Sequence, residues 1–273
     1  MALVSGTVID AFKILDKYPE LYSCIDRAKF SAQVQKKYPN GAEVNDNEVT
    51  DLFTALLISE LPGLAQQGNN AATPQGGLLN IEEAIKEFSF TADERKKLGD
   101  KLCNLRSSSL WDTLNELLLA RNILKNLPGH RVVIEYPLGQ GTKGQQPKDA
   151  DVAVLDSNGN AILLFDAVTP NRVTGAVASV PGQIVDWIER KYDTKFSDYC
   201  QANPSANVAV IVCLMKNEHF YTAFPMKLVT GTPAALPGAR LSAKAGLKIG
   251  MACSFRCVDG KILLLDQIAK FPV

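Results

Sequence analysis

Two nearly continuous apolar runs, each adjoining an aspartate, flank a tight-turn sequence in the middle of the chain. Residues 152–155 follow Asp151, and residues 161–165 lead into Asp166. Between them, Asn158-Gly159 supplies the positive-φ conformation that a hairpin turn needs. Runs this apolar are typical of strands that are covered on both faces. The stretch therefore predicts a β-hairpin at the centre of a sheet.

The two aspartates lie at the same end of this predicted hairpin. Asp151 precedes Asn158 by seven residues, and Asp166 follows Gly159 by seven. Neighbouring carboxylates raise each other's pKa unless a cation lies between them, and oxygen ligands suit Mg²⁺ or Mn²⁺. One interpretation is a divalent-metal site at Asp151 and Asp166. The other is that Asp151 caps a strand at the surface and Asp166 begins a turn.

Composition narrows the function classes. A chain of 273 residues with 46% hydrophobic content can bury a sizeable core. Lysine plus arginine balance aspartate plus glutamate at 29 each, which argues against a coat of basic charge for nucleic acid but is compatible with a local basic groove. Six cysteines without a Cys-x-x-Cys pair, and two histidines, predict neither a disulfide framework nor a zinc site.

No apolar run reaches the roughly 20 residues of a membrane span, and the first residues do not resemble a secretory leader. These features predict a cytoplasmic protein, or a nuclear one in a eukaryote, with no membrane partner.

Residues 1–77 predict a helical region of unknown role. Tyr18-Pro19 and Tyr38-Pro39 divide residues 8–60 into helical pieces, and Asn45 to Glu48 has the composition of a helix start. Residues 61–77 are rich in Gly, Gln, Asn and Ala, which predicts a loop and a domain boundary. Residues 78–273 would then form an α/β domain.

Within that domain the apolar periodicity predicts alternating helices and strands. Helices are expected over residues 81–88, 92–102, 109–127 and 183–199, and strands over 131–136, 151–155, 161–166, 208–214, 253–258 and 261–265. Thr91 and Glu94 have the spacing of a capping box at the start of the second helix. The helix between the second hairpin strand and residues 208–214 favours parallel pairing of those two strands. Gly139, Gly141 and Gly144 match a phosphate-binding pattern, but no helix follows them, so a dinucleotide site is not expected.

This order of elements and acids, over roughly residues 107–215, resembles the PD-(D/E)XK nuclease superfamily, which has a restriction-endonuclease-like core with a mixed sheet flanked by helices. On this resemblance Glu116 matches the acid of the first core helix, and Asp151 and Asp166 match the two strand acids. Gln183 opens a motif similar to the superfamily's Gln-x-x-x-Tyr, with Trp187 in place of tyrosine.

The sequence departs from the superfamily pattern at Val168, where the lysine of the (D/E)XK triplet would stand. Lys191 on the following helix and Lys148 beside the first acid are candidates for a migrated lysine, and Gln183 would orient the site. Asp149 competes with Asp151 as the first strand acid.

The resemblance implies a metal-dependent nuclease that hydrolyses phosphodiesters of DNA or RNA. Asp151, Asp166 and Glu116 would hold Mg²⁺ or Mn²⁺, and a homodimer is a further expectation by analogy. The alternative is a catalytically inactive nuclease-like protein that serves as a nucleic-acid-binding, regulatory or structural subunit. The valine at the lysine position and the neutral net charge favour this alternative.

Overall fold

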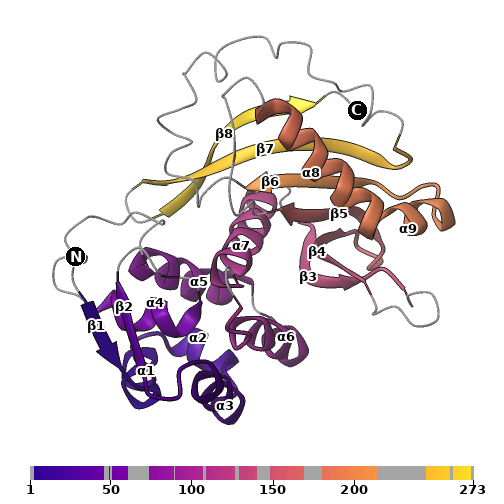
Figure 1. Ribbon diagram of the computed structural model, residues 1–273. Coiled ribbons are helices and arrows are strands. Elements are labelled where there is room, and N and C mark those ends of the chain that lie inside the picture. The colour runs from indigo at the N-terminus through magenta and orange to yellow at the C-terminus, as the bar shows by residue number, and fades with distance from the viewer. Residues whose placement is uncertain are drawn as a thin grey trace. The chain divides into compact units, whose positions relative to one another are not determined.

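The protein has a mixed α/β structure (Figure 1). The computed structural model describes residues 3–45, 49, 51–60, 74–88, 90–106, 109–126, 129–139, 148–168, 180–213, 244–258 and 261–271. None of the helices in these ranges combines the length and the apolar character needed to cross a membrane.

A six-stranded sheet in the order β3-β4-β5-β6-β7-β8 contains the predicted hairpin. Its strands are β3 (Arg131–Pro137), β4 (Asp149–Leu155), β5 (Ala161–Val168), β6 (Val208–Cys213), β7 (Leu247–Val258) and β8 (Lys261–Phe271). β3, β4 and β5 pair antiparallel, whereas β6 pairs parallel with both β5 and β7. The mixed sheet and the parallel pairing after the hairpin are as predicted, while β7 and β8 are longer than expected.

The turn between β4 and β5 sets the register of the hairpin. Gly159 has φ of +83°, and the Asp156 carboxylate accepts hydrogen bonds from the backbone N–H groups of Asn158 and Asn160 at 2.8 and 2.9 Å. These bonds hold the pKa of Asp156 below its usual value. The register pairs Val152 with Phe165, so the predicted hairpin is confirmed.

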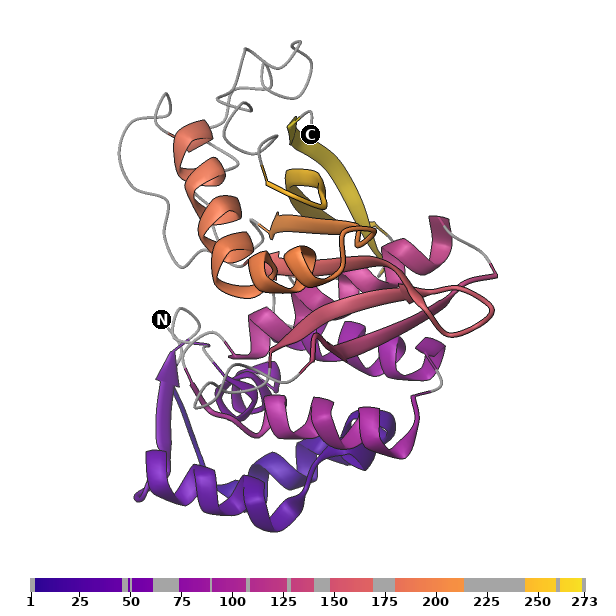
Figure 2. The ribbon, with the colours of Figure 1, turned by 90° about the vertical axis from the view of Figure 1, so that its right-hand side faces the viewer.

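Helix α8 (Val180–Lys195) packs against β5 and β6, and Figure 2 shows it running along the sheet. Three residues of the helix itself, Ile184, Val185 and Ile188, are buried, as its apolar spacing predicts. The single helix expected over residues 183–199 is instead two helices, because Phe196, with φ −107°, separates α8 from α9 (Ser197–Ala202). Phe196 is fully buried in the same core.

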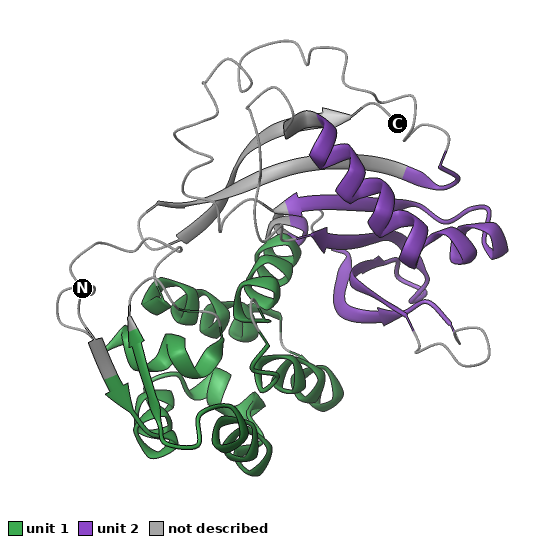
Figure 3. Cartoon of the chain, viewed as in Figure 1, with its two compact units in different colours: residues 1–121, 256–263 green, residues 122–255, 264–273 purple. Residues whose placement is uncertain are grey.

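The chain forms two compact units, which are coloured separately in Figure 3. The first comprises Met1–Arg121 and Arg256–Leu263, and the second comprises Asn122–Phe255 and Leu264–Val273.

The first unit is largely helical. It contains β1 (Leu3–Gly6), α1 (Val8–Leu15), α2 (Pro19–Cys24), α3 (Arg27–Lys37), β2 (Ala42–Asn45), α4 (Leu52–Ser59), α5 (Pro74–Phe88), α6 (Ala92–Leu102) and most of α7 (Ser109–Asn126). The antiparallel pair β1–β2 was not predicted. The capping box predicted before α6 is confirmed, because the Glu94 carboxylate accepts from the Thr91 N–H at 2.8 Å.

One prediction for this half is wrong in position. The helix expected to begin near residues 45–48 begins at Leu52, because the carboxylate of Asp51 caps it by accepting from the Thr54 N–H at 3.0 Å. The boundary expected at residue 77 falls inside α5, whose contacts with α2 and α4 join it to the first unit. Residues 61–73 of the predicted loop, residues 140–147 and the turn at residues 259–260 lie outside the described residues.

Candidate active site

Asp151 and Asp166 lie opposite each other on β4 and β5. Val152 pairs with Phe165, so Asp151 and Asp166 occupy the next position along this antiparallel pair of strands. Asp151 is 6% exposed and Asp166 is fully buried, and each lies within its strand rather than at a surface turn. The alternative of a surface cap and a turn acid is therefore wrong.

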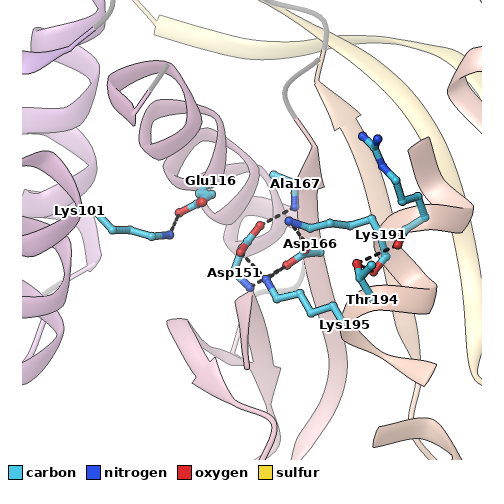
Figure 4. Close-up of polar contacts among 9 residues, drawn as sticks. Lys101, Glu116, Asp151, Asp166, Ala167, Lys191, Thr194 and Lys195 are labelled. Atoms are coloured by element: carbon cyan, nitrogen blue, oxygen red, sulfur yellow. Dashed lines mark hydrogen bonds and ion pairs between the residues drawn. The ribbon is translucent and has the colours of Figure 1, made fainter. Parts of the chain in front are cut away.

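Each carboxylate also bonds to the backbone of the neighbouring strand. The Ala167 N–H donates to Asp151 Oδ2 at 2.8 Å, and the Asp151 N–H donates to Asp166 Oδ1 at 3.3 Å (Figure 4). These reciprocal bonds fix the two side chains on the same side of the hairpin.

Two lysines of α8 neutralise the pair. Lys195 Nζ contacts Oδ1 of both aspartates, at 2.8 Å for Asp151, and Lys191 Nζ lies 2.8 Å from Asp166 Oδ2 (Figure 4). Because the lysines are four residues apart, they lie on one face of the helix. Asp166 Oδ2 is buried and accepts no hydrogen bond among the described residues, so its contact with Lys191 is an ion pair without hydrogen-bond alignment.

The C-terminal half of α8 is fastened to the chain just before β7. The hydroxyl of Tyr192 donates to the carbonyl oxygen of Ala245 at 2.5 Å, and Lys244 pairs with Asp193 at 2.7 Å and with Glu189 at 3.2 Å. Burial raises the pKa of Tyr192, so the phenol remains a donor at neutral pH. These contacts hold the helical turn that carries both lysines.

Of the other residues singled out from the sequence, Lys148 does not join the pair. Its ammonium lies 3.7 Å from the exposed carboxylate of Asp198. Gln183 is on α8 but eight residues before Lys191, about 12 Å along the helix axis. Glu116 belongs to the first unit, where it accepts from Lys101 at 2.5 Å. Within the second unit, the structure thus brings together Asp151, Asp166 and Lys191.

Lys195 was not singled out from the sequence, although a signal for it was present. Gln183, Trp187 and Lys191 are spaced four apart, and Lys195 is the next member of that row. In a helix over residues 183–199, Lys195 lies one turn after Lys191 on the same face.

Glu135 on β3 is a second residue that sequence reasoning missed. The β3–β4 pairing joins Ile134 to Val152 and Tyr136 to Ala150, which leaves Glu135 opposite Asp151. A carboxylate oxygen of Glu135 lies within 4.8 Å of one of Asp151. Glu135 is also the one non-glycine residue among those described with a positive φ, 53°. Nothing in its alternating strand sequence indicated this conformation.

The donor atoms of this site suit a hard divalent cation. Asp151 and Asp166 offer carboxylate oxygens, the ligands that Mg²⁺ and Mn²⁺ prefer, and one oxygen of Asp166 accepts no hydrogen bond among the described residues. The two ammonium groups already balance the charge of the two carboxylates. The residues therefore fit such an ion in type, with Lys195 in the bridging position.

Comparison with known proteins adds little. No protein-family model matches the chain, and no curated protein matches it. Among solved structures, a match was found to SfsA of Pyrococcus furiosus in complex with Ca²⁺, with 14% sequence identity and a TM-score of 0.26. It covers 60% of this chain and 64% of SfsA, less than two thirds of that protein. A match at this TM-score does not establish a shared fold.

Proposed function

We propose that this protein is a metal-dependent nuclease with a PD-(D/E)XK-like core. The observation that carries the proposal is the buried pair Asp151 and Asp166 on neighbouring strands, with Lys191 of the following helix 2.8 Å from Asp166. Val168 cannot supply the lysine of the superfamily's triplet, and Lys191 offers an ammonium group next to the second acid instead.

In this proposal each residue has a distinct task. Asp151 and Asp166 would hold Mg²⁺ or Mn²⁺ through their oxygens, and a bound ion would supply Lewis acidity toward a water and the phosphate. Lys191, whose side chain is 32% exposed, stabilises negative charge on the phosphodiester. The backbone bonds from Ala167 and Asp151 keep the carboxylates in place without rearrangement during the reaction.

The test is a cleavage assay with Mn²⁺ or Mg²⁺ on single- and double-stranded DNA and RNA. Wild type is compared with Asp166→Asn and Lys191→Met. We expect Asp166→Asn to abolish cleavage and Lys191→Met to reduce it by about 10²-fold or more, the range for loss of one electrostatic stabiliser. Cleavage that persists in Asp166→Asn would remove this site as its source.

A second candidate is a nuclease-like protein without catalytic activity, which acts as a binding or structural subunit. The observation that favours it is the complete charge balance of Asp151 and Asp166 by Lys191 and Lys195. In this second candidate, the cluster has a purely structural role and fastens α8 to the sheet. Absence of cleavage on every substrate, together with calorimetry that detects no Mn²⁺ binding, would favour this function.

A further inference from the structure

Lys195 occupies the position in which a cation bridges the two aspartates. Its ammonium contacts one oxygen of Asp151 and one of Asp166, whereas Lys191 contacts Asp166 alone in the ion pairs described. A divalent ion shared by two carboxylates of neighbouring strands would take one oxygen from each in the same way. An ion that took these two Oδ1 atoms would displace the Lys195 ammonium.

Electrostatic repulsion opposes the presence of a divalent ion and the Lys195 ammonium at the two aspartates at the same time. The carboxylates are 6% and 0% exposed, and their two charges are matched by two ammonium groups. Adding a divalent ion while both lysines stay would leave an excess of positive charge at these buried carboxylates even when the nearby Glu135 carboxylate is counted, which is unfavourable. One ammonium must withdraw, and Lys195 is the one that lies between the aspartates. It is the last residue of α8 and is followed by Phe196, which separates α8 from α9.

We propose that Lys195 is a built-in cation that competes with divalent metal ions for Asp151 and Asp166. Without metal it would keep the buried carboxylates paired, and with metal bound it would withdraw while Lys191 stays beside Asp166. This inference rests on the proposed function, because it concerns the same two carboxylates. In addition to that function, it gives Lys195 the role of lowering the metal affinity that Asp151 and Asp166 provide.

The experiment is calorimetric titration of the full chain with Mn²⁺ alone, in the wild type and in three variants. Lys195→Met removes the charge and keeps the length of the side chain. We expect this variant to bind Mn²⁺ at least about tenfold more tightly than wild type. The reason is that repulsion between an ammonium group and the ion at contact distance, at a partly buried site, lowers the affinity by more than that factor. Lys191→Met, from the same helix face, should tighten binding by a smaller factor. Asp166→Asn should bind none.

Thermal unfolding gives a second readout that is independent of activity. Lys195→Met should unfold at a lower temperature than wild type without metal, and saturating Mn²⁺ should raise its unfolding temperature by more than it raises that of wild type. If Lys195→Met does not fold, Lys195→Gln decides the matter, because it removes the charge but keeps an N–H donor for the aspartates.

Affinity for Mn²⁺ that is unchanged or weaker in the folded Lys195 variant would overturn the inference. Failure of the proposed function looks different. If the Lys195 variant binds Mn²⁺ more tightly but no variant cleaves any nucleic acid, the nuclease proposal fails and the competition stands. If wild type cleaves and the Lys195 variant has unchanged affinity, the nuclease proposal stands and the competition fails.

Discussion

A fully buried carboxylate keeps its charge only where other groups replace the water it has lost. Asp166 meets this condition through Lys195, Lys191 and the Asp151 N–H. Asp151 meets it through Lys195 and the Ala167 N–H. Both residues therefore contribute to stability as well as to the proposed chemistry, and substitutions at them must be assessed for folding before activity is interpreted.

Asp166→Asn should lower the free energy of unfolding by about 3 kcal/mol, the lower end of the range for breaking a buried pair. The lower end applies because the side chains of Lys191 and Lys195 are 32% and 16% exposed, so water solvates part of the charge left behind. Urea denaturation at neutral pH measures the change. Asp149→Asn, at the partly buried start of the same hairpin, is the control and should change stability by less than about 0.5 kcal/mol. Equal losses in both variants would contradict this assignment of roles.

Glu135 combines a carboxylate near Asp151 with a backbone conformation that favours glycine. Two substitutions separate these properties, because Glu135→Gly removes both the carboxylate and the strain, whereas Glu135→Ala removes the carboxylate alone. We expect the glycine variant to be more stable than the alanine variant by about 1 kcal/mol, the cost of the left-handed region for a residue with a Cβ. Urea denaturation measures the difference, and equal stability would show that the position carries no strain.

At the scale of the elements, the turn of the β4–β5 hairpin aligns the two acids. Gly159 has φ of +83°, and a Cβ built there would meet no atom within 4 Å. Gly159→Ala should therefore cost about 1 kcal/mol through backbone strain alone. Gly182 in α8 has equally open surroundings without a positive φ, and Gly182→Ala should stabilise the helix by up to about 1 kcal/mol. Thermal denaturation of both variants tests this contrast, which a purely steric effect would not produce.

The sequence predicted those elements whose signals are local. The hairpin followed from apolar runs around Asn158-Gly159, α6 from its capping box, and the parallel pairing of β5 with β6 from the helix between them. The pair β1–β2 was missed because strands of four residues lack a measurable period. The break at Phe196 was missed because a buried aromatic residue there is compatible with a continuous helix.

The residues of the candidate site could be singled out from the sequence to the same extent. Asp151 and Asp166 were found because an acid at the end of an apolar strand is unusual, and Lys191 because it shares a helix face with Gln183. Lys195 lies within the helix expected over residues 183–199 and was overlooked there, whereas the conformation of Glu135 depends on pairing between strands. Lys148 is near Asp151 in sequence, but its ammonium lies 3.7 Å from Asp198.

At the scale of the whole molecule, burial of ionisable thiols and phenols couples stability to alkaline pH. Burial raises the pKa of Cys103 to about 11 from 9.0, and it raises the pKa of Cys24, Tyr38 and Tyr192 as well. These groups are neutral in their protonated form, so the folded state holds their protons more tightly than the unfolded state does. Their contribution is complete below the unfolded pKa and is lost as pH rises through the folded pKa.

The free energy of unfolding should therefore decrease between about pH 9 and pH 11, and Cys103 should account for a loss on the order of 2 kcal/mol. Urea denaturation at intervals across this range measures the slope in wild type and in Cys103→Ala. The substitution leaves a small cavity whose cost is the same at every pH, so the difference between the two slopes isolates ionisation of the thiol. The variant should show the shallower decrease, and native Cys103 should resist alkylation at pH 8 because little thiolate forms while the protein is folded. Parallel slopes with rapid alkylation would show that water reaches this thiol in the folded protein.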